Sequence, residues 1–447
     1  MSEMGSVRKC LILAAGRGSR LASWGATKPR LRLLGVPLIE RVILTAQRAG
    51  LSEFTIVTGY NGERLRKLLD DLAVRRGVCL ETVVNPEWKT AGNGLSVLKA
   101  KGALAEPFVL LMADHLVDER LLVALQSEPL AEGTVRLAID RNTRNPLVDL
   151  DDVTKVQTQD GVLRRIGKGI ERCDAFDTGC FLCSPALFPA LERAAAERGD
   201  TTLSGGIQIL AEQGKVGTLD IGDASWIDVD DVRAVKRAER LLLDGLAKAS
   251  DGPVSRHLNR PLSKRLSRHL VRSSITPNQI SLFCFGVSAL AAGLFAMGGH
   301  LLLALGAVFA QFASVIDGCD GEVARLKFRE SSFGGWFDAV LDRYADAILL
   351  FGLTWHAFVA RDASIVLIVG FLAIVGSFMN SYTADKYDGL MKARFEQGRG
   401  IRIGRDVRVL MISLGALFNQ PFLTLSLIAG LMNVETVRRV VVARGDA

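Results

Sequence analysis

The chain has 447 residues, of which 49% are hydrophobic and 23% charged, and its formal net charge is +7. This length allows two or three domains, and the composition fits neither an ordinary soluble enzyme nor a pure membrane bundle. Charged and apolar residues mix evenly over residues 1–245, whereas apolar stretches of membrane length follow Gln279. We therefore expect a soluble part joined to a membrane part.

The N-terminal half reads as alternating strands and helices. Lys9–Gly16, Phe54–Tyr60 and Phe108–Ala113 are apolar and read as strands, and Glu63–Leu72 reads as a helix. This alternation predicts a parallel sheet with helices on both faces. Ligands bind beyond the carboxyl ends of the strands in such sheets. The glycine-rich loop after the first strand and Asp114 both follow such ends.

The residues at these strand ends suit a nucleotide. Gly16 and Gly18 lack a Cβ and let backbone N–H groups approach the base and the phosphates. Arg20 and Lys28 add positive charge where a triphosphate is held, and Asp114 offers the hard oxygen ligands that Mg²⁺ prefers. A second acid would complete a metal site. It is expected near the end of a late strand, WIDVD at 226–230.

Residues 8–240 resemble the sugar-phosphate nucleotidyltransferases, whose signature LAAGxGxR followed by KP is matched from Leu13 to Pro29. The resemblance implies an α/β Rossmann-like domain over residues 1–245. It also implies attack of a substrate phosphate on the α-phosphate of a nucleoside triphosphate, with release of pyrophosphate. The nucleotide would be held by Leu13, Ala14, Ala15, Gly16, Gly18, Lys28, Asn93 and Asp114.

The same resemblance assigns roles at the reacting phosphates. Arg20 and Lys28 stabilise the transferred charge, and Asp114 with Asp228 holds the metal. Asp230 competes with Asp228 for the metal. We favour Asp228, because the family places that acid two residues after an aromatic residue.

Three stretches narrow the subclass: NPEW at 85–88, NGLSVLKA at 93–100 and MADH at 112–115. They look like the inositol-1-phosphate cytidylyltransferase branch, which uses CTP. Lys168 and the run Asp177-Thr-Gly179 match positions near the acceptor-phosphate pocket of such enzymes. The alternative for Lys168 is an ordinary surface lysine. His115 is equally well explained as a ligand or as a hydrogen-bonded structural residue.

Residues 246–275 are expected to form a linker and an interfacial helix. Leucines recur at helical spacing over Leu258–Val271 with arginines between them, a pattern typical of a helix lying on a membrane surface. The basic residues there are Arg256, Arg260, Lys264, Arg265, Arg268 and Arg272. Next to apolar segments they favour a cytoplasmic membrane anchor over a solvated helix face. Nucleic acid is not expected as a partner, because aromatic residues do not interleave with the basic ones.

Residues 276–447 are expected to form an all-α domain of six transmembrane helices. The apolar segments are 279–298, 301–324, 333–358, 364–384, 407–419 and 421–437. The fifth is short for a span of about 20 residues. Lys and Arg precede the first segment, separate the second from the third and the fourth from the fifth, and follow the sixth. By the positive-inside rule both termini and both active sites face the cytoplasm, which predicts a multi-pass protein of the plasma membrane.

Four aspartates lie where the second and third apolar segments meet. Asp317 and Asp320 are three residues apart, and Asp338 and Asp342 are four apart, so each pair lies on one helix face. Four unpaired carboxylates near lipid would be very costly. A divalent-metal site fits best, and two metals could clamp a diphosphate.

The spacing D-x₂-D-G-x₂-A-R-x₈-G-x₃-D-x₃-D resembles the CDP-alcohol phosphotransferases at every fixed position, and the resemblance covers residues 255–440. It implies that Asp317, Asp320 and Asp338 hold metals on the CDP diphosphate. Asp342 would complete the cluster as the general base. It also implies that Gly321 and Gly334 approach the cytidine closely and that Arg325 pairs with phosphate. The acceptor phosphate would be bound by Lys386, Arg405 and Arg408. For any one of those last three, anchoring at the membrane is an equal alternative.

The whole chain is similar to the bifunctional inositol-1-phosphate cytidylyltransferase and di-myo-inositol-phosphate-phosphate synthase family. That similarity implies CTP, inositol 1-phosphate and CDP-inositol as substrates, Mg²⁺ or Mn²⁺ as cofactor, and a homodimer formed through the membrane domain. One alternative is a phospholipid synthase whose N-terminal domain activates another phospho-alcohol. A second is an N-terminal domain that serves as a regulatory module.

Overall fold

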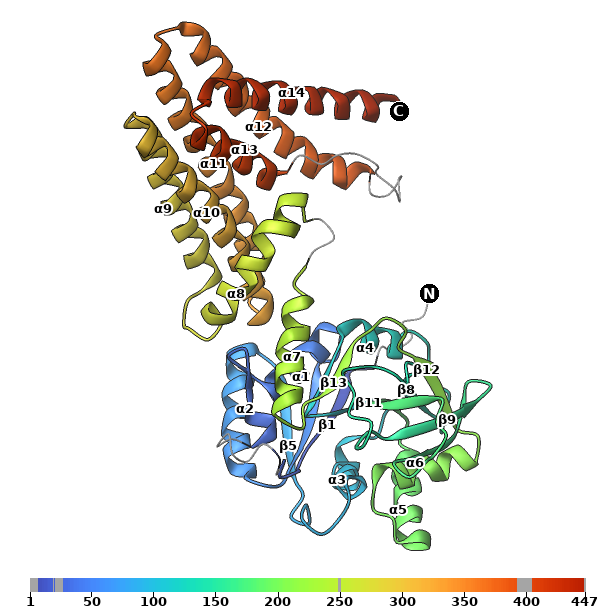
Figure 1. The fold of residues 1–447 in the computed structure, drawn as a ribbon. Coiled ribbons are helices and arrows are strands. Elements are labelled where there is room, and N and C mark those ends of the chain that lie inside the picture. Colours follow the sequence, from blue (N-terminus) through green and yellow to red (C-terminus); the bar gives the residue numbers. More distant parts are fainter. Residues whose placement is uncertain (1–6, 19, 21–26, 248–250, 392–403, 446–447) are drawn as a thin grey trace. The chain divides into compact units, whose positions relative to one another are not determined.

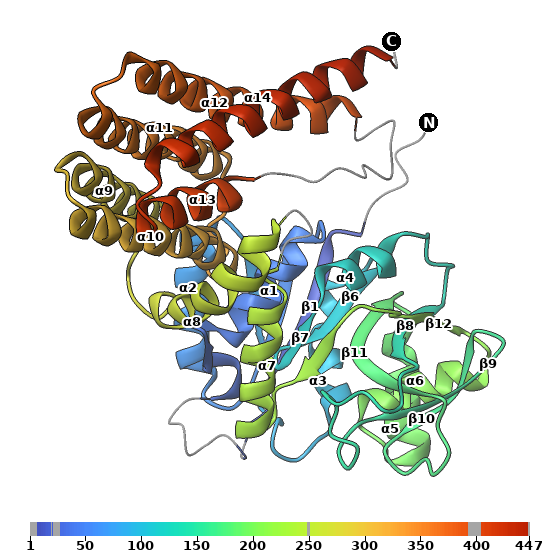
Figure 2. The same cartoon turned by 45° about the horizontal axis from the view of Figure 1, so that its top comes forward.

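The computed structural model describes residues 7–18, 20, 27–247, 251–391 and 404–445, without the side chains of 385–391 and 443–445. The chain divides into two compact units, Met1–Leu241 and Leu242–Ala447. The first is an α/β unit and the second is helical (Figure 1, Figure 2).

A mixed sheet, nine-stranded over the described residues, forms the centre of the α/β unit, in the order β5-β4-β1-β6-β11-β8-β12-β10-β9. Its strands are β1 (Lys9–Ala14), β4 (Glu53–Thr58), β5 (Cys79–Val84), β6 (Phe108–Met112), β8 (Val135–Asp140), β9 (Lys155–Gln159), β10 (Val162–Gly167), β11 (Ala175–Cys183) and β12 (Val216–Asp220). Two small ladders pair β13 (Trp226–Asp228) with β7 (His115–Val117) and β2 (Arg32–Leu33) with β3 (Val36–Pro37).

The prediction of a parallel sheet is correct for only some of the neighbouring strands. Strands β5, β4, β1 and β6 are parallel, as are β8 and β12, but β11 runs antiparallel to β6 and β8. Strand β10 is also antiparallel, to β9 and β12. A two-residue turn joins β9 to β10, and both Asp160 (φ 55°) and Gly161 (φ 75°) have the positive φ that a tight hairpin turn requires. This Asp-Gly pair is a hairpin signal in the sequence that the strand–helix alternation concealed.

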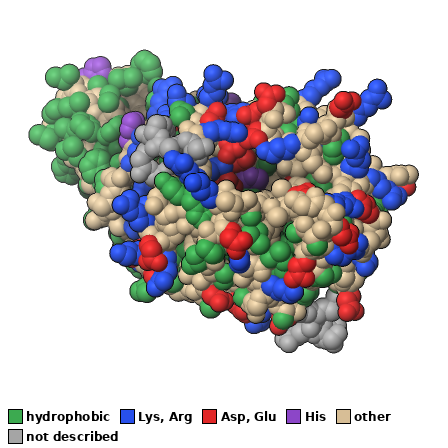
Figure 3. Space-filling model, turned by 90° about the horizontal axis from the view of Figure 1, so that it is seen from below, with side chains coloured by type: hydrophobic (Ala, Val, Ile, Leu, Met, Phe, Trp, Pro, Cys, Tyr) green, Lys and Arg blue, Asp and Glu red, His purple; other side chains and the backbone are tan. Residues whose placement is uncertain are grey.

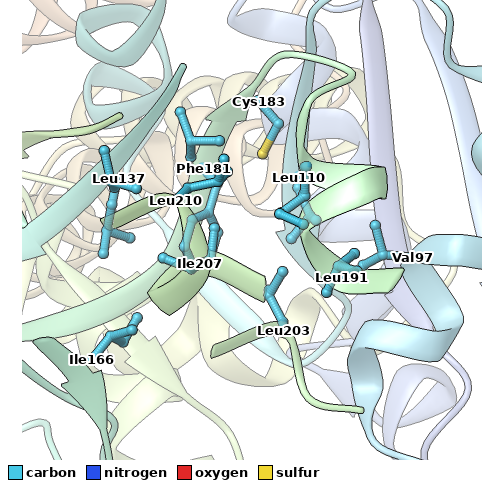
Figure 4. Close-up of a cluster of buried hydrophobic side chains, with 14 of the residues drawn as sticks. Val97, Leu110, Leu137, Ile166, Phe181, Cys183, Leu191, Leu203, Ile207 and Leu210 are labelled. Atoms are coloured by element: carbon cyan, nitrogen blue, oxygen red, sulfur yellow. The ribbon is translucent and has the colours of Figure 1, made fainter. Parts of the chain in front are cut away.

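Helices cover both faces of the sheet, because side chains alternate along each strand. On one face, Leu11 and Leu13 join a buried cluster with residues of α3 (Asn93–Lys99), α5 (Leu187–Arg198) and α6 (Leu203–Glu212). Figure 4 shows this cluster, with side chains of the sheet such as Leu110 and Phe181 lying against those of the helices. The opposite cluster joins Cys10 and Ile12 to α1 (Leu38–Arg48), α2 (Gly62–Arg76) and α4 (Glu119–Gln126). Each fully buried leucine stabilises the fold by roughly 1.5–3 kcal/mol.

The helical unit begins with η4 (Ser255–Asn259) and α8 (Arg260–Leu270). Its longer helices are α9 (Pro277–Ala296), α10 (His300–Leu326), α11 (Ser332–Arg361), α12 (Ser364–Met391), α13 (Arg405–Leu417) and α14 (Pro421–Gly445). Thr276 caps α9 as expected: its Oγ1 accepts from the N–H of Gln279 (3.3 Å), whose side chain accepts from the N–H of Thr276 (3.0 Å).

Small residues let these helices approach closely. A Cβ on Gly352 of α11 would lie 2.5 Å from the carbonyl oxygen of Ala292 in α9, so no larger residue fits without separating the two helices. Around this contact, one buried apolar cluster takes residues from all six helices α9–α14. Large apolar side chains also face outward, among them Leu282, Phe351 and Phe371, and Figure 3 shows hydrophobic side chains crowded on the visible end of this unit.

Each of the six apolar segments forms a helix, but among the described residues three helices are long and apolar enough to cross a membrane. These are Pro277–Ala296, His300–Leu326 and Ser364–Ala384. Helix α13 has 13 residues and spans about 20 Å at ~1.5 Å per residue, less than the ~30 Å of a bilayer core. The first half of α11 carries Asp338, Asp342 and Asp346, which lowers its hydropathy.

Candidate active sites

The glycine-rich loop after β1 forms one wall of a cavity of about 280 Å³ in the α/β unit. Predicted residues that line it are Leu13, Ala14, Gly16, Gly18, Arg20, Lys28 and Asp114. Ala15 is buried, and its carbonyl oxygen accepts a hydrogen bond from the N–H of Tyr60 (3.0 Å), which ties the loop to the end of β4. Figure 3 shows a hollow in this unit with acidic and histidine side chains around it.

Lys28 lies at the centre of this cavity. Its Nζ is 2.6 Å from Asp114 Oδ2 and 3.1 Å from Asp228 Oδ1, and it also pairs closely with Asp230. Burial lowers the pKa of Lys28, but these three carboxylates outweigh burial and raise it above its ordinary value. Gly18 has φ +61°, and a Cβ there would lie 2.6 Å from the Cβ of Lys28. The glycine is therefore required for the loop to pack against this lysine.

Strand pairing brings the acidic residues together from distant parts of the chain. Strand β13 pairs with β7 so that Asp228 lies opposite His115, and the N–H of Val229 donates to the carbonyl oxygen of Asp114 (3.0 Å). One ligand atom from each of Asp114, His115 and Asp228 falls within 4.8 Å of the others. This set of hard oxygens and an imidazole nitrogen fits a divalent cation.

Hydrogen bonding orients His115. Its Nδ1 is 2.8 Å from the carbonyl oxygen of Thr178 and therefore donates, which leaves Nε2 facing Asp228 Oδ2 at 3.5 Å. Burial lowers the pKa of His115, but Asp228 and Asp114 raise it to about 10. Burial and the neighbouring Asp228 raise the pKa of Asp230 to about 6. These contacts show the structural hydrogen bond of His115. Its role as a ligand stays a prediction, because a ring protonated at both nitrogens offers no lone pair to a cation.

A second cavity of about 310 Å³ shares Asp114, Asp152 and Asp230 with the first. Lys168, predicted near the acceptor phosphate, lines this second cavity, as do Asp177 and Gly179. Asn93, predicted to hold the nucleotide, also lines this cavity and not the first one. Burial raises the pKa of Asp177 to about 6, although the N–H of Gly179 donates to its carboxylate (2.8 Å). The two cavities together can hold two ligands that meet at the shared aspartates.

Sequence reasoning missed Asp152 and Arg237. Asp152 accepts from Nη1 of Arg20 (2.7 Å) and pairs with Lys168, so it links two predicted cationic residues more than a hundred positions apart. Arg237 lines the second cavity from α7 (Val232–Asp244), and its buried Nε has no hydrogen-bond partner in the described part of the chain. Neither residue belongs to a recognisable motif.

We expect Gly179→Ala to impair chemistry in these cavities. Gly179 has φ +75°, and a Cβ would lie 2.3 Å from His115 Nδ1, so the ring must move away from Thr178 and Asp228. The rate of pyrophosphate formation should fall about 10–100-fold, the usual cost of disturbing a supporting residue at a metal site. Gly161→Ala is the control, because it also has positive φ but a Cβ there meets nothing within 4 Å. Equal rates for the two variants would contradict the role given to His115.

In the helical unit, α10 and α11 bring the four predicted aspartates together. One oxygen each from Asp317, Asp338 and Asp342 lies within 4.8 Å of the others. Asp320 accepts from Ser281 Oγ (2.6 Å) and from the N–H of Gly321. A group of carboxylate oxygens at this spacing fits divalent cations.

One arginine of α13, Arg405, contacts the acidic quartet formed by Asp317, Asp320, Asp338 and Asp342. Nη1 of Arg405 is 2.8 Å from Asp317 Oδ2 and 2.9 Å from Asp342 Oδ1. Arg408 is buried and pairs with Asp346 instead. Lys386 falls in α12, but its side chain lies outside the described residues.

A cavity of about 220 Å³ opens onto the quartet. All four aspartates, Gly321, Arg325 and Arg405 line it, together with residues of η4 and α8. Gly334 lies in the first turn of α11, where its N–H donates to Ser331 Oγ (2.9 Å). Nη2 of Arg325 donates to the carbonyl oxygen of Leu246 (3.2 Å).

Arg260 does not belong to the expected membrane-surface anchor. It lines the cavity, and its guanidinium pairs with Asp251 (2.7 Å) and with the fully buried Glu322 (2.7 Å). Ser263 of α8 also donates to Glu322 (2.7 Å). Helix α8 is therefore fixed to α10 by charge-assisted hydrogen bonds, and one face of it forms part of the cavity wall.

Comparisons with known proteins give a separate family match for each of the two units. Residues 10–213 match the family model of MobA-like NTP transferase domains, and residues 274–437 match that of the CDP-alcohol phosphatidyltransferases. The chain is 37% identical to the bifunctional IPC transferase and DIPP synthase of Rubrobacter xylanophilus, over 96% of this chain and 94% of that protein. It is 31% identical to the protein of the same name from Aquifex aeolicus, over 98% and 100%.

Among solved structures, the chain is similar to the inositol-1-phosphate CTP transferase from T. maritima. That similarity has a TM-score of 0.48 and 24% identity, and it covers 53% of this chain and 95% of the other.

Fold, acidic cavities and family models together define an enzyme in which a nucleotidyltransferase is joined to a CDP-alcohol phosphotransferase. The chain belongs to the family of bifunctional IPC transferases and DIPP synthases.

Proposed function

We propose that the chain makes CDP-inositol in its first unit and consumes it in its second. The first reaction joins CTP and inositol 1-phosphate to give CDP-inositol and pyrophosphate. The second transfers the phosphoinositol group to another inositol 1-phosphate, which gives di-myo-inositol phosphate phosphate and CMP. The observation that carries the proposal is one chain with two acidic cavities, each in a domain of the matching family.

In the first reaction, CTP occupies the cavity formed by the glycine-rich loop and inositol 1-phosphate occupies the neighbouring one. A phosphate oxygen of inositol 1-phosphate attacks the α-phosphorus of CTP, and the bond to the β-phosphate breaks. Arg20 and Lys28 stabilise the charge that accumulates on the phosphates, while Lys168 contacts the acceptor phosphate and Asn93 contacts the nucleotide. Asp114 and Asp228 hold the metal, with Asp230 as the competing ligand.

In the second reaction, a hydroxyl of inositol 1-phosphate attacks the phosphorus that carries inositol in CDP-inositol. Asp342 accepts the hydroxyl proton, and the bond to CMP breaks. Asp317, Asp320 and Asp338 hold the metal, Gly321 and Gly334 lie near the cytidine, and Arg325 pairs with phosphate. Arg405, Arg408 and Lys386 bind the acceptor phosphate.

We further propose Mg²⁺ as the cation at both acidic groups, with Mn²⁺ as a substitute. When bound, it supplies positive charge that neutralises the phosphates in the transition state. The ligands at both sites are chiefly carboxylates, which these hard cations prefer over soft ligands.

The proposed location in the cell rests on the distribution of basic residues and on the lengths of the apolar helices. We propose that residues 276–447 form six transmembrane helices, that residues 246–275 are the linker and interfacial helix, and that residues 1–245 face the cytoplasm with both active sites. Three helices of sufficient length and hydropathy support a membrane protein. The plasma membrane and a homodimer formed through the membrane domain belong to the same proposal.

The purified full chain, given radiolabelled inositol 1-phosphate, CTP and Mg²⁺ without added lipid, tests this function. We expect labelled product in the water phase together with pyrophosphate and CMP. A phospholipid synthase would require a lipid substrate and would place labelled product in the organic phase. A regulatory N-terminal unit would release no pyrophosphate from any combination of CTP and inositol 1-phosphate. Either of these outcomes would contradict the proposal.

A further inference from the structure

Asp346 is a buried carboxylate in the helical unit that the motif of the acidic quartet does not include. It lies on α11, four residues and about one helical turn beyond Asp342, and is 2% exposed. A charge buried within a membrane domain is expensive unless it is paired, and such charges usually have a function. Its partners therefore indicate what it does.

Those partners are the two arginines at the start of α13. Arg405 donates from Nε to Asp346 Oδ1 (3.2 Å), and Arg408 donates from Nη2 to Asp346 Oδ2 (2.7 Å). Nη2 of Arg408 also donates to Ser381 Oγ on α12 (3.1 Å). One carboxylate thus fixes two guanidinium groups, each through a separate oxygen.

Of the two arginines that contact Asp346, Arg405 is the one that also reaches the cavity of the acidic quartet. Its Nε edge contacts Asp346, while its Nη1 faces Asp317 and Asp342 at 2.8 and 2.9 Å. Arg405 lines the cavity of the quartet, whereas Asp346 is not one of the described residues that line this cavity. Asp346 can therefore act on a ligand in this cavity only through Arg405, because the buried Arg408 does not line it.

Electrostatic attraction explains why Arg405 needs a carboxylate on the side that faces away from the quartet. The quartet alone attracts a guanidinium strongly, and an unanchored Arg405 would be drawn fully onto its carboxylates. Asp346 attracts the Nε edge from the other side, so that the side chain is held between the two groups. A guanidinium fixed in this way has its N–H groups preorganised for a phosphate, which its planar fork recognises.

We propose that Asp346 is a positioning residue for the acceptor phosphate, which it serves by fixing Arg405 at the cavity. The inference rests on the proposed function of the second unit. Asp346 itself does not contact the substrate. The affinity for the phosphorylated acceptor, and not that for the CDP-alcohol, depends on this carboxylate.

Asp346→Asn in the full chain tests the inference, with CDP-inositol supplied and CMP release measured. We expect the KM for inositol 1-phosphate to rise about tenfold or more, the scale of a lost charge-assisted interaction. The KM for CDP-inositol should change by less than about twofold. Inorganic phosphate, used as a competitor, should inhibit the variant more weakly than the wild type. Asp346→Glu, which keeps the charge, should restore much of the lost affinity.

Two controls separate positioning from general damage. His356→Gln changes another buried side chain of α11, whose Nδ1 contacts the carbonyl oxygen of Phe295 (3.1 Å), and should leave both KM values unchanged. Pyrophosphate release from CTP and inositol 1-phosphate, which takes place in the other unit, should also be unaffected by Asp346→Asn.

Three outcomes would overturn the inference. An unchanged KM for inositol 1-phosphate would do so, and so would an equal rise in both KM values or a failure of Asp346→Glu to restore affinity. A wild-type chain that releases no CMP from CDP-inositol and inositol 1-phosphate would instead contradict the proposed function, and the inference with it. The wild-type measurement thus distinguishes the two failures.

Discussion

Asp342→Asn is expected to lower CMP release from CDP-inositol by about 10²–10⁴-fold, the contribution of a general base. Asparagine has the shape of aspartate but accepts no proton from the attacking hydroxyl. It also removes one carboxylate oxygen from the group formed with Asp317 and Asp338. The measurement is CMP formation with supplied CDP-inositol and inositol 1-phosphate at saturating Mg²⁺.

Asp362→Asn is the matched control for this change. It makes the same substitution at the exposed C-terminal end of the same helix, at φ +47°, a conformation that asparagine tolerates well. It should retain the wild-type rate within about twofold. The Asp342→Asn protein should be no less stable than the wild type, because the substitution removes a like charge from a crowded acidic group. A CMP rate equal to that of the control would exclude Asp342 as the base.

Asp114→Asn is expected to abolish most pyrophosphate formation in the first unit. Lost stabilisation of the phosphate charge is worth several kcal/mol, or about 10²–10³-fold at ~1.36 kcal/mol per factor of ten. Asp114 is both a contact of Lys28 and a member of the group with His115 and Asp228. The measurement is pyrophosphate release from CTP and inositol 1-phosphate.

The control for Asp114 lies four residues further along the chain. Asp118 caps α4 by accepting from the N–H of Arg120 (2.9 Å), and asparagine caps equally well, so Asp118→Asn should be nearly as active as the wild type. The Asp114→Asn chain should still consume supplied CDP-inositol at the normal rate. If both reactions were lost together, the assignment of one reaction to each unit would be wrong.

Local sequence signals predicted the elements that carry the chemistry. The apolar run before the glycines became β1, the spacing of the quartet brought both pairs to one cavity, and Thr276 capped α9. These features depend on residues close together in the chain, where periodicity and capping chemistry apply directly.

Long-range partners could not be predicted in the same way. Lys28 meets Asp230 across about 200 positions and Arg20 meets Asp152 across 132, and no local pattern marks either pair. Arg260 appeared to be one more basic residue of a surface helix, yet its partner Glu322 lies 62 positions away on α10. Asp346 is different, because its spacing of four from Asp342 on one helix face was visible in the sequence.

Mixing the Asp342→Asn chain with the Asp114→Asn chain tests the central claim most directly. Asp342→Asn alone should convert CTP and inositol 1-phosphate into accumulating CDP-inositol, and Asp114→Asn alone should make it about 10²–10³-fold more slowly. Combined in one tube with Mg²⁺, they should restore CMP release and the water-soluble phosphodiester, because CDP-inositol made by one chain is consumed by the other. If the mixture released pyrophosphate but no CMP, CDP-inositol would not be the intermediate that joins the two units, and the account would be contradicted.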